Sequence, residues 1–472
     1  MAGVTANNDG NGQGMKMLLG AFEMVNPNNG MPTWTHPDGR GDDWDDLAHW
    51  TSLAKTLDAA GFDFLFFADT YGYPTLEGRV PDETIAHGIQ FPALDPMLMI
   101  AALAAQTTSL GFVVTSPTVA ERPYGTARRF ATLDRLTGGR IGWNIVTGSS
   151  QATTDALFGL EAAAPGAHDS RYDAAEEFVE LCLRFWEQSW DDDAEVRDRA
   201  RNVYADPAKV RPVSFEGEHH RGHGVFAVPP TPQRTPVLFQ AGTSDRGRAF
   251  AARNAEAVFI QGQSIPQAAG VVADVRARAI AAGRPADDIA VISGATIVVA
   301  RTGEEAHARR AELDTLYALD DAAVMFAGFT GVDLTREDPD TLLEDVVLPA
   351  GGAQGQTLLD RYRAQGSVRV RDVLDGFRRR GIRGFLVTGS PVEVADELET
   401  IARETGLAGF MLEPTFGGPG CFEDFCELVV PLLRERGLLA DAPGPTLRER
   451  MHPGGGPRLA PTHPAVSLRA HA

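Results

Sequence analysis

The chain has 472 residues, 43% of them hydrophobic, and a formal net charge of −21 at pH 7. A chain of this length can bury a large core, as two ordinary domains or as one barrel with insertions. The acidic balance argues against nucleic acid or an anionic membrane surface as a partner.

Neither end of the chain, nor any stretch between, reads as a membrane or export signal. No apolar run approaches the roughly 20 residues that cross a bilayer. The start, MAGVTANNDGNGQG, lacks the basic and apolar regions of a signal peptide. We therefore expect a soluble, cytoplasmic protein with no membrane partner.

Short apolar runs alternate with amphipathic helical patterns along the chain. The eight strand candidates are residues 17–22, 64–68, 110–114, 141–146, 237–240, 258–261, 290–299 and 409–412. The clearest helical patterns are residues 44–60, 96–106, 172–186 and 246–254. Eight such units predict an α/β fold, a (β/α)₈ TIM barrel.

The domain boundaries follow from where this alternation stops. We expect one domain over residues 15–451, with long insertions at about 148–235 and 326–380 that serve as lids or substrate walls. Residues 1–14 and 452–472 are rich in Gly, Asn, Pro and Ala, which predicts disordered tails.

The cysteines and histidines do not form the pattern of a metal site. Cys182, Cys421 and Cys426 are odd in number and lack CxxC spacing, which favours buried free thiols. The histidines of the loop SFEGEHHRGHG, residues 214–224, have no cysteine or carboxylate at supporting spacing. We predict a solvated loop there and no metal.

Residues 121–149, ERPYGTARRFATLDRLTGGRIGWNIVTGS, read as a helix, a glycine turn and a buried strand. Asn144 and Thr147 then lie at the carboxyl end of that strand, where parallel sheets bind ligands. The structural alternative is an Asn144 side chain that satisfies loop backbone. This unit alone does not decide between them.

A second unit, VLFQAGTSDRGRAFAARNAEAVF, leads from a buried strand through Gly242, Thr243 and Ser244 into a helix. The glycine permits close backbone approach, the hydroxyls donate, and free amides at a helix N-terminus attract an anion. A phosphate is the natural occupant. The alternative is that Ser244 or Asp245 only caps the helix.

A third unit, HDSRYDAAEEFVELCLRFW, begins a helix with His168 and Tyr172 four residues apart, so that both could face one ligand. Arg171 would add positive charge near the same end. A His–Tyr pair of this kind more often packs in the core than binds a ligand. Because the other two loops also predict a ligand site, we favour contact between this pair and the ligand.

Taken together, these motifs resemble the nitrilotriacetate, dibenzothiophene-sulfone and pristinamycin-type monooxygenases, a branch of the bacterial-luciferase-like superfamily. The resemblance runs from about Met17 to Arg450. Its markers are WTHP (34–37), FDFLFFADTYG (62–72), LDP (94–96), PYGTARRFATLDRLTGGRIGWNIVTG (123–148), HDSRY (168–172), QAGTS (240–244), TGSPVEVAD (388–396) and TLRER (446–450).

The resemblance implies a binding site for FMN. The residues that match contacts on the isoalloxazine side are Asp69, Thr115 and Asn144. The residues that match ribityl and phosphate contacts are His168, Tyr172, Thr243 and Ser244. We expect the strand ends to contact the isoalloxazine ring and the loop before the helix to contact the phosphate. The resemblance therefore agrees with the patterns above.

The implied reaction is oxygenation of a small organic substrate by reduced FMN and O₂, through a flavin 4a-hydroperoxide or peroxide. A separate NADH-dependent flavin reductase would supply the reduced flavin, which fits the lack of a GxGxxG fingerprint after a strand. The substrate chemistry stays open among C–S or C–N cleavage, N-oxygenation, and Baeyer–Villiger or imine oxidation. The resemblance also implies a homodimer or homotetramer.

Departures from the family pattern concern the substrate side. Arg122 stands where relatives often have His, and Gly148 where they have Ser. His36 is then the best catalytic candidate, since it follows the first strand and titrates near neutral pH, although it could instead organise its loop. The next loop could line the substrate pocket with Tyr71, Tyr73 and His87.

Two other functions stay open. A deazaflavin-dependent reductase on the same barrel would keep the phosphate loop and transfer hydride without O₂, although the WTHP, HDSRY and TLRER blocks argue against it. A non-catalytic flavin carrier would account for the lost polar positions.

Overall fold

The computed structural model describes most of the chain. The described residues are 16–28, 34–37, 39, 41–73, 75–76, 78–148, 151–160, 168–242, 244–330, 332–346, 362, 366–381, 383–415, 420–441 and 444–470. The tail expected at residues 1–14 lies outside them. Within them, no helix combines the length and apolar composition that a membrane span needs.

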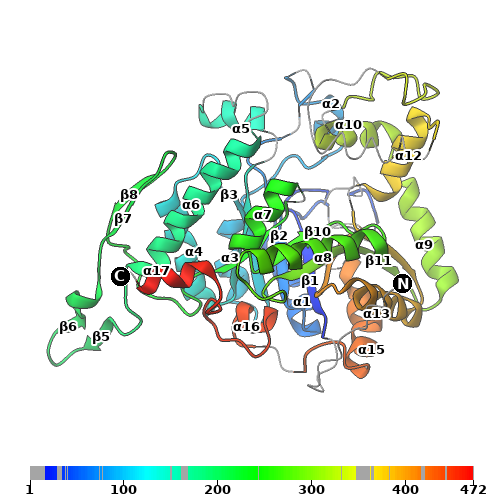
Figure 1. Cartoon of the computed structure of the whole chain (residues 1–472). Coiled ribbons are helices and arrows are strands. Elements are labelled where there is room, and N and C mark those ends of the chain that lie inside the picture. Colours follow the sequence, from blue (N-terminus) through cyan, green and yellow to red (C-terminus); the bar gives the residue numbers. More distant parts are fainter. Residues whose placement is uncertain are drawn as a thin grey trace, which may run out of the picture.

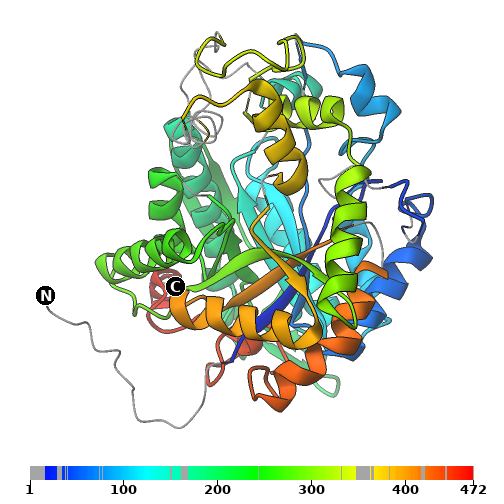
Figure 2. The same ribbon diagram turned by 90° about the vertical axis from the view of Figure 1, so that its right-hand side faces the viewer.

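Eight parallel strands form a closed barrel, which confirms the predicted fold (Figures 1 and 2). In order around the barrel they are β1 (Leu18–Glu23), β2 (Phe64–Phe67), β3 (Gly111–Pro117), β4 (Ile141–Val146), β9 (Val237–Gln240), β10 (Ala257–Ile260), β11 (Ala290–Val299) and β13 (Gly409–Glu413). The β13–β1 and β10–β11 pairings close the ring. Each strand coincides, within three residues at either end, with one of the eight expected.

Helices surround the strands on the outside (Figure 2). They are α1 (Leu47–Ala60), α3 (Ile100–Ala104), α4 (Pro123–Thr137), α6 (His168–Gln188), α7 (Asp245–Asn254), α8 (Ile265–Ala281), α9 (Gly303–Thr315), α13 (Pro391–Thr405), α14 (Gly420–Leu428) and α15 (Val430–Glu435). Their apolar faces pack on outward strand residues in the main core, which includes Trp50, Phe130 and Trp143.

Aromatic side chains fill the barrel interior. Phe22 stacks on Phe66 with ring centroids 5.7 Å apart, and lies 6.1 Å from Phe259. Phe66 also contacts Phe239 at 6.3 Å. Because this layer is solid, a ligand cannot pass through the barrel, and inward side chains beyond the layer must meet ligands at the carboxyl ends of the strands.

The TLRER block closes the opposite, amino-terminal end of the barrel. Leu447, in α16 (Leu447–Met451), joins the inner core. The Arg448 guanidinium is buried and pairs with Glu256 at 2.6 Å and 2.9 Å, and it also donates to backbone carbonyls of the β9 approach. This motif therefore serves stability rather than a binding site.

The segment between β4 and β9 carries α5 (Gln151–Phe158), α6 and two hairpins that sequence patterns did not predict. The hairpins are β5 (Glu195–Asp198) with β6 (Val203–Ala205) and β7 (Val213–Glu216) with β8 (Arg221–Gly224). They project from the barrel in Figure 1. The histidine loop expected at residues 214–224 forms the second hairpin, where Glu177 accepts backbone N–H bonds from His219 and His220.

The second long segment builds a small separate core. Its helices are α10 (Leu319–Thr330) and α12 (Val370–Arg380), and Phe326 packs edge-on against Phe377 at 5.4 Å. Figure 1 shows these helices beside α2 (Asp82–Ala86) and near α5, at one end of the barrel. A ninth strand, β12 (Phe385–Gly389), then pairs with the second half of β11.

The expected disorder of residues 452–472 is wrong for residues 452–470. The helix α17 (Ser467–Ala470) and the preceding turn pack on the barrel, with Leu459 and Ala465 buried. The His463 ring lies between the backbone carbonyl of Asn254, at 3.0 Å, and the backbone N–H of Ala465, at 3.2 Å. The Gly- and Pro-rich composition suggested disorder. The buried Leu459 and Ala465 and the hydrogen bonds of His463 nevertheless hold the segment on the barrel.

Candidate functional site

Thr115 and Asn144 meet at the carboxyl ends of two adjacent strands. The parallel register pairs the two residues, and Asn144 Nδ2 donates to Thr115 Oγ1 at 2.9 Å. Both side chains are 4% exposed, and Asn144 Oδ1 is buried without a hydrogen-bond partner among the described residues. A buried acceptor left open is costly, so a donor from a ligand would complete this amide.

Asp69 lies at the same end of the barrel, two residues beyond β2. Its Oδ1 accepts the Thr70 backbone N–H at 2.8 Å. Burial raises the pKa of Asp69 to about 7, the Thr70 hydrogen bond opposes this, and the nearby Asp95 carboxylate adds to the rise. The structure thus joins Thr115 to Asn144 and places Asp69 in the loop that follows the neighbouring strand β2.

The loop between β9 and α7 forms a tight cradle. Ser244 caps α7, since its Oγ accepts the Gly247 N–H at 3.0 Å, and its hydroxyl proton stays available to donate. A Cβ placed on Gly247 would lie 2.7 Å from the Tyr172 hydroxyl, and one on Gly242 would lie at the same distance. Tyr172 and Ser244 therefore converge on a backbone that only glycine allows to come so near.

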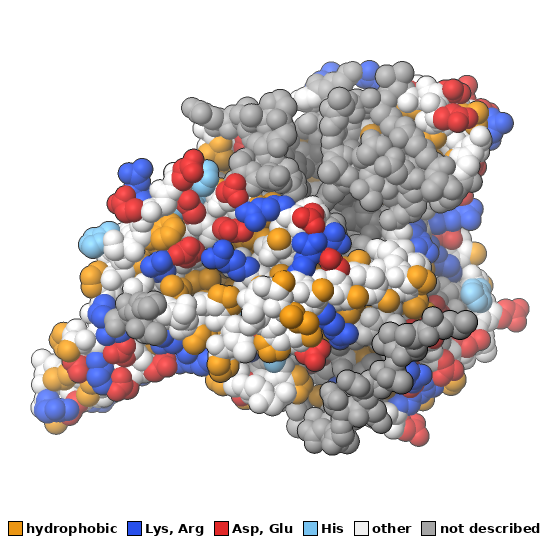
Figure 3. Space-filling model, in the orientation of Figure 1, with side chains coloured by type: hydrophobic (Ala, Val, Ile, Leu, Met, Phe, Trp, Pro, Cys, Tyr) orange, Lys and Arg blue, Asp and Glu red, His pale blue; other side chains and the backbone are white. Residues whose placement is uncertain are grey.

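Two basic side chains near this cradle pair with carboxylates. Arg246 pairs with Asp173 at 2.6 Å and with Glu176 at 2.9 Å, and Arg278 pairs with Asp245 at 2.6 Å. Over the face in Figure 3, basic and acidic side chains are interspersed in the same way. The cradle thus offers hydroxyls and the N-terminal end of α7, and Arg246 and Arg278 are held by carboxylates.

Three predicted site residues cannot be placed at this cradle or at the mouth. Thr243 and the side chain of His168 lie outside the described residues, although the backbone of His168 begins α6. His36 is partly exposed in a short turn, where its backbone carbonyl accepts the Gly39 N–H at 2.9 Å.

A polar pair on the opposite wall was missed by sequence reasoning. Gln261 Nε2 donates to Glu413 Oε1 at 2.8 Å, and the Gly384 N–H donates to Glu413 Oε2 at 3.1 Å. Burial raises the pKa of Glu413, and Arg383 only partly opposes it. Glu413 ends the buried strand β13 and Gln261 follows the buried strand β10, so the strand-end rule that singled out Asn144 could have found them.

The two tyrosines of the β2 loop make fixed contacts. The Tyr71 hydroxyl donates to Glu121 at 2.5 Å, and its ring stacks on Phe158 of α5 at 5.2 Å. Tyr73 packs edge-on against Phe91 at 5.3 Å. These contacts tie the loop to the elements around the mouth.

His87 joins that loop to the second long segment. Its Nδ1 lies 2.5 Å from Asp321 Oδ1 of α10, and its side chain is about half exposed. The neighbouring Ile89 enters the small core of that segment. His87 therefore links two elements above the barrel.

The two departures from the family pattern have different surroundings. Gly148 has a φ of +91°, a conformation that L side chains rarely adopt, so a glycine fits this backbone better than serine. Arg122 immediately precedes α4 and is exposed.

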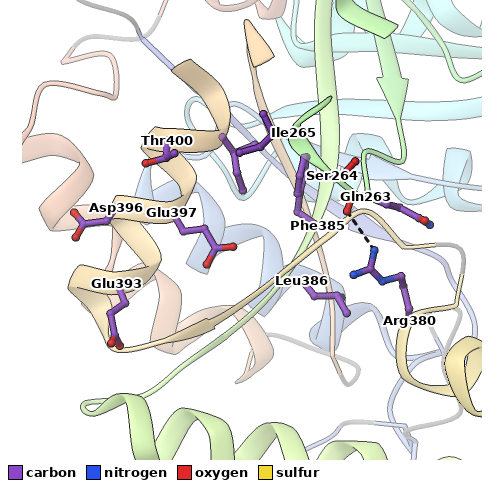
Figure 4. A pocket seen from close by; sticks show the side chains of 11 residues that line it. Gln263, Ser264, Ile265, Arg380, Phe385, Leu386, Glu393, Asp396, Glu397 and Thr400 are labelled. Carbon is purple, nitrogen blue, oxygen red and sulfur yellow. Dashed lines mark hydrogen bonds between the residues drawn. The ribbon is translucent and has the colours of Figure 1, made fainter. Parts of the chain in front are cut away.

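A cleft of about 660 Å³ lies away from this end wall, between the start of α8, β12 and α13 (Figure 4). Carboxylates of α13 line one side, and Arg380 donates to the Gln263 carbonyl at 3.4 Å. None of the predicted site residues lines it. The candidate site is the end wall and the cradle.

Comparison with known proteins gives a consistent result. The family model described as luciferase-like monooxygenase matches residues 28–409. The chain is 37% identical to a long-chain alkane monooxygenase of Geobacillus thermodenitrificans, covering 92% of this chain and 94% of that protein. It is 37% identical to a dimethyl-sulfide monooxygenase of Hyphomicrobium sulfonivorans, covering 96% and 94%.

Solved structures agree. A riboflavin lyase, crystallised with modified FMN and riboflavin, superposes with a TM-score of 0.88 at 40% identity, covering 96% of this chain and 99% of that one. The three monooxygenase types expected from the motifs are also similar to this chain, at 30–33% identity. The resemblance read from the sequence is confirmed.

Proposed function

The chain belongs to the luciferase-like monooxygenase family and is a flavin-dependent monooxygenase of small organic substrates; we propose that its flavin is FMN, supplied in reduced form by a separate NADH-dependent flavin reductase. The observation that carries this proposal is the cradle of Tyr172 and Ser244 at the start of α7. It suits a terminal phosphate, which FMN has and riboflavin lacks.

The cradle fits a phosphate in three respects. Two hydroxyls converge on it, α7 begins there with the positive end of its dipole, and the glycines leave the space that a Cβ would fill. The isoalloxazine ring would lie towards Thr115 and Asn144, where the open Oδ1 acceptor meets a ring N–H. Thr243 and His168 complete the proposed set of FMN ligands.

Bound reduced FMN supplies the two electrons that activate O₂. The residues of this chain hold the ring at the strand ends and exclude water. The helices α5, α10 and α12 lie at one end of the barrel (Figure 1). Exclusion of water favours transfer of oxygen to the substrate over release of hydrogen peroxide.

The pairing of Arg246 and Arg278 with carboxylates also supports delivery by a partner. Ionic bonds to phosphate are strong, whereas hydroxyls and helix amides hold it less tightly. Arg246 and Arg278 are committed to carboxylates, so the flavin can be exchanged between turnovers. Such exchange is what a diffusible flavin from a reductase requires.

The substrate stays open within the small organic class. The names of similar proteins span an alkane, a thioether and riboflavin. C–S or C–N cleavage, N-oxygenation, and Baeyer–Villiger or imine oxidation are the reactions to screen. We also propose a homodimer or homotetramer, and a cytoplasmic location that suits the three free cysteines.

The decisive experiment is reconstitution under air with chemically reduced FMN, with reduced deazaflavin, and with either omitted. The proposal expects O₂ uptake and oxygenated product from a substrate panel with reduced FMN alone. Hydride transfer from the deazaflavin without O₂ would instead show the reductase alternative. Structures of deazaflavin-dependent enzymes match this chain at only 13–15% identity, which is a likeness of fold.

A further inference from the structure

We propose that Gln261 binds the substrate of the oxygenation, and that this substrate carries an N–H or O–H group that donates to the side-chain oxygen of Gln261, Oε1. The inference rests on the proposed function, because it names a substrate contact for that reaction. It narrows the small organic substrates to compounds with a hydrogen-bond donor, which simple alkanes and thioethers lack.

The side chains of Gln261 and Glu413 point into the barrel. Residues two apart along a strand face the same side of the sheet. Phe259 of β10 and Met411 of β13 both belong to the inner core. Gln261 and Glu413 follow them by two residues, so they form the next layer towards the carboxyl ends of the strands, where parallel barrels bind their ligands.

The two side chains reach across the strand between them, β11, and meet above Gly294. Gln261 Nε2 donates to Glu413 Oε1 at 2.8 Å. A Cβ placed on Gly294 would overlap Gln261 Oε1 and would lie 3.0 Å from the carboxyl carbon of Glu413. Ile292, two residues earlier on β11, belongs to the inner core, so this Cβ would point into the barrel. Gln261 Oε1 therefore lies inside the barrel.

Glu413 sets the orientation of the Gln261 amide. Its second oxygen, Oε2, accepts the Gly384 N–H at 3.1 Å and the Thr296 hydroxyl at 3.4 Å. Burial raises the pKa of Glu413, but these donors and the charge of Arg383 favour the ionised form. An ionised carboxylate only accepts, so it selects the NH₂ group of the Gln261 amide and leaves the carbonyl oxygen to another partner.

That carbonyl oxygen is an acceptor without a donor. Gln261 Oε1 is buried and has no hydrogen-bond partner among the described residues. A buried acceptor left unpaired is costly, so a ligand that donates to it is stabilised. Asn144 Oδ1 is open in the same way, and we have assigned it to the flavin ring. The mouth of the barrel thus holds a second polar anchor that the flavin assignment does not use.

The position of Gln261 favours the substrate over the flavin as its ligand. The ring contacts Thr115 and Asn144 and the phosphate loop belong to β3, β4 and β9, which are neighbours around the barrel. Gln261, Thr296 and Glu413 belong to the next three strands, β10, β11 and β13. A flavin held by the first three strands leaves the second three to face the molecule that it oxygenates.

Three variants test the contact. Gln261→Met keeps the length of the side chain and removes its acceptor. Gln263→Met is the matched control, because Gln263 lines the cleft between α8, β12 and α13 (Figure 4). Glu413→Gln is the second test variant, because an amide at this position both donates and accepts and no longer selects the NH₂ group of Gln261. Thermal unfolding of each variant checks its folding.

Binding is measured on the protein loaded with oxidised FMN, whose absorbance changes when a ligand lies beside the ring. The probes are matched pairs that differ in their N–H or O–H groups: octanamide and N,N-dimethyloctanamide, benzamide and N,N-dimethylbenzamide, octanol and methyl octyl ether. In at least one pair, wild type and Gln263→Met should bind the donor at least about tenfold more tightly than its methylated partner.

That preference should disappear in Gln261→Met and shrink in Glu413→Gln, while the affinity of each variant for FMN changes by less than about fivefold. If the wild-type protein neither binds FMN nor consumes O₂ with reduced FMN, the proposed function fails. If it does both, but none of the pairs shows the preference in wild type, or Gln261→Met retains it, the assignment of Gln261 is overturned. The pair of Gln261 and Glu413 would then only tie the strands together.

Discussion

Asn144 on β4 donates to the Thr115 hydroxyl on β3, and this bond leaves its carbonyl oxygen buried without a partner. In this arrangement the Thr115 hydroxyl accepts from the NH₂ group of Asn144. What remains is an acceptor aimed at a ligand, at the end of the barrel where parallel strands bind one.

Asn144→Ala should therefore weaken FMN binding. The loss of one hydrogen bond to the ring corresponds to about 1–3 kcal/mol, or roughly five- to 150-fold in Kd. Thr115→Ser is the matched control, since it keeps the hydroxyl and should change the Kd little. Titration of flavin fluorescence measures both, and equal affinities for wild type and Asn144→Ala would remove the amide from the site.

Gly247→Ala should block the cradle. The added Cβ would lie 2.7 Å from the Tyr172 hydroxyl and 3.1 Å from Ser244 Oγ. We expect FMN affinity to fall at least about tenfold, because the two hydroxyls must move apart. Gly125→Ala, on α4 with no neighbour within 4 Å of the new Cβ, should leave affinity unchanged and add about 0.5–1 kcal/mol of stability.

If Gly247→Ala bound FMN as wild type does, the phosphate would lie elsewhere. Thermal unfolding of both variants serves as the check on folding, so that a loss of affinity is not confused with a loss of structure.

Arg448→Met should destabilise the barrel without touching the site. It leaves the buried Glu256 charge unpaired, at a cost of about 3–5 kcal/mol in the free energy of unfolding. Arg436→Met is the control: Arg436 pairs on the surface with Glu399, and its loss should cost no more than about 1 kcal/mol. Denaturant unfolding at pH 7 compares them, and equal midpoints would contradict the assigned role.

The same pair sets an acid limit to stability. Burial would raise the pKa of Glu256, but Arg448 outweighs it and lowers the pKa to about 2. A depressed carboxyl pKa stabilises the fold above the unfolded value near 4.3. That contribution should be lost as the pH falls from about 4 through 2, and Arg448→Met should lack this part of the pH dependence.

His463 should anchor the last segment. Burial lowers the pKa of its ring below the ordinary value, so the folded state holds the neutral form. Its contribution to stability is present above about pH 6.5 and is lost as the pH falls below that. His463→Ala should release residues 452–470 to limited proteolysis at pH 8, whereas wild type should become cleavable there only under acid. Protection of the variant would contradict the anchor.

The barrel was predictable because each of its strands is a compact apolar run bounded by turns, as at residues 141–146. β12 was missed because alternate side chains along it are partly exposed. The hairpins from β5 to β8 were missed because their burial pattern is mixed and exposed. Hydrophobic runs signal strands that are buried on both faces, and these are not.

The site was predictable where a strand end carries a polar residue, as at Asn144, or where glycines precede a helix, as at Ser244. Glu413 and Gln261 obey the same rule and were missed because only their pairing across β10 and β13 makes them notable. The charge on Asp69 could not be judged either, because it depends on burial and on Asp95, a residue distant in sequence.

The most direct test of the account is a fluorescence titration of the wild-type protein with FMN and with riboflavin, repeated on Ser244→Ala and Tyr172→Phe. The two flavins differ by the phosphate alone. We predict that wild type binds FMN at least about tenfold more tightly than riboflavin, and that both variants lose most of this preference. Equal binding of the two flavins by the wild-type protein, or an undiminished preference in both variants, would contradict the assignment of the cradle to the FMN phosphate.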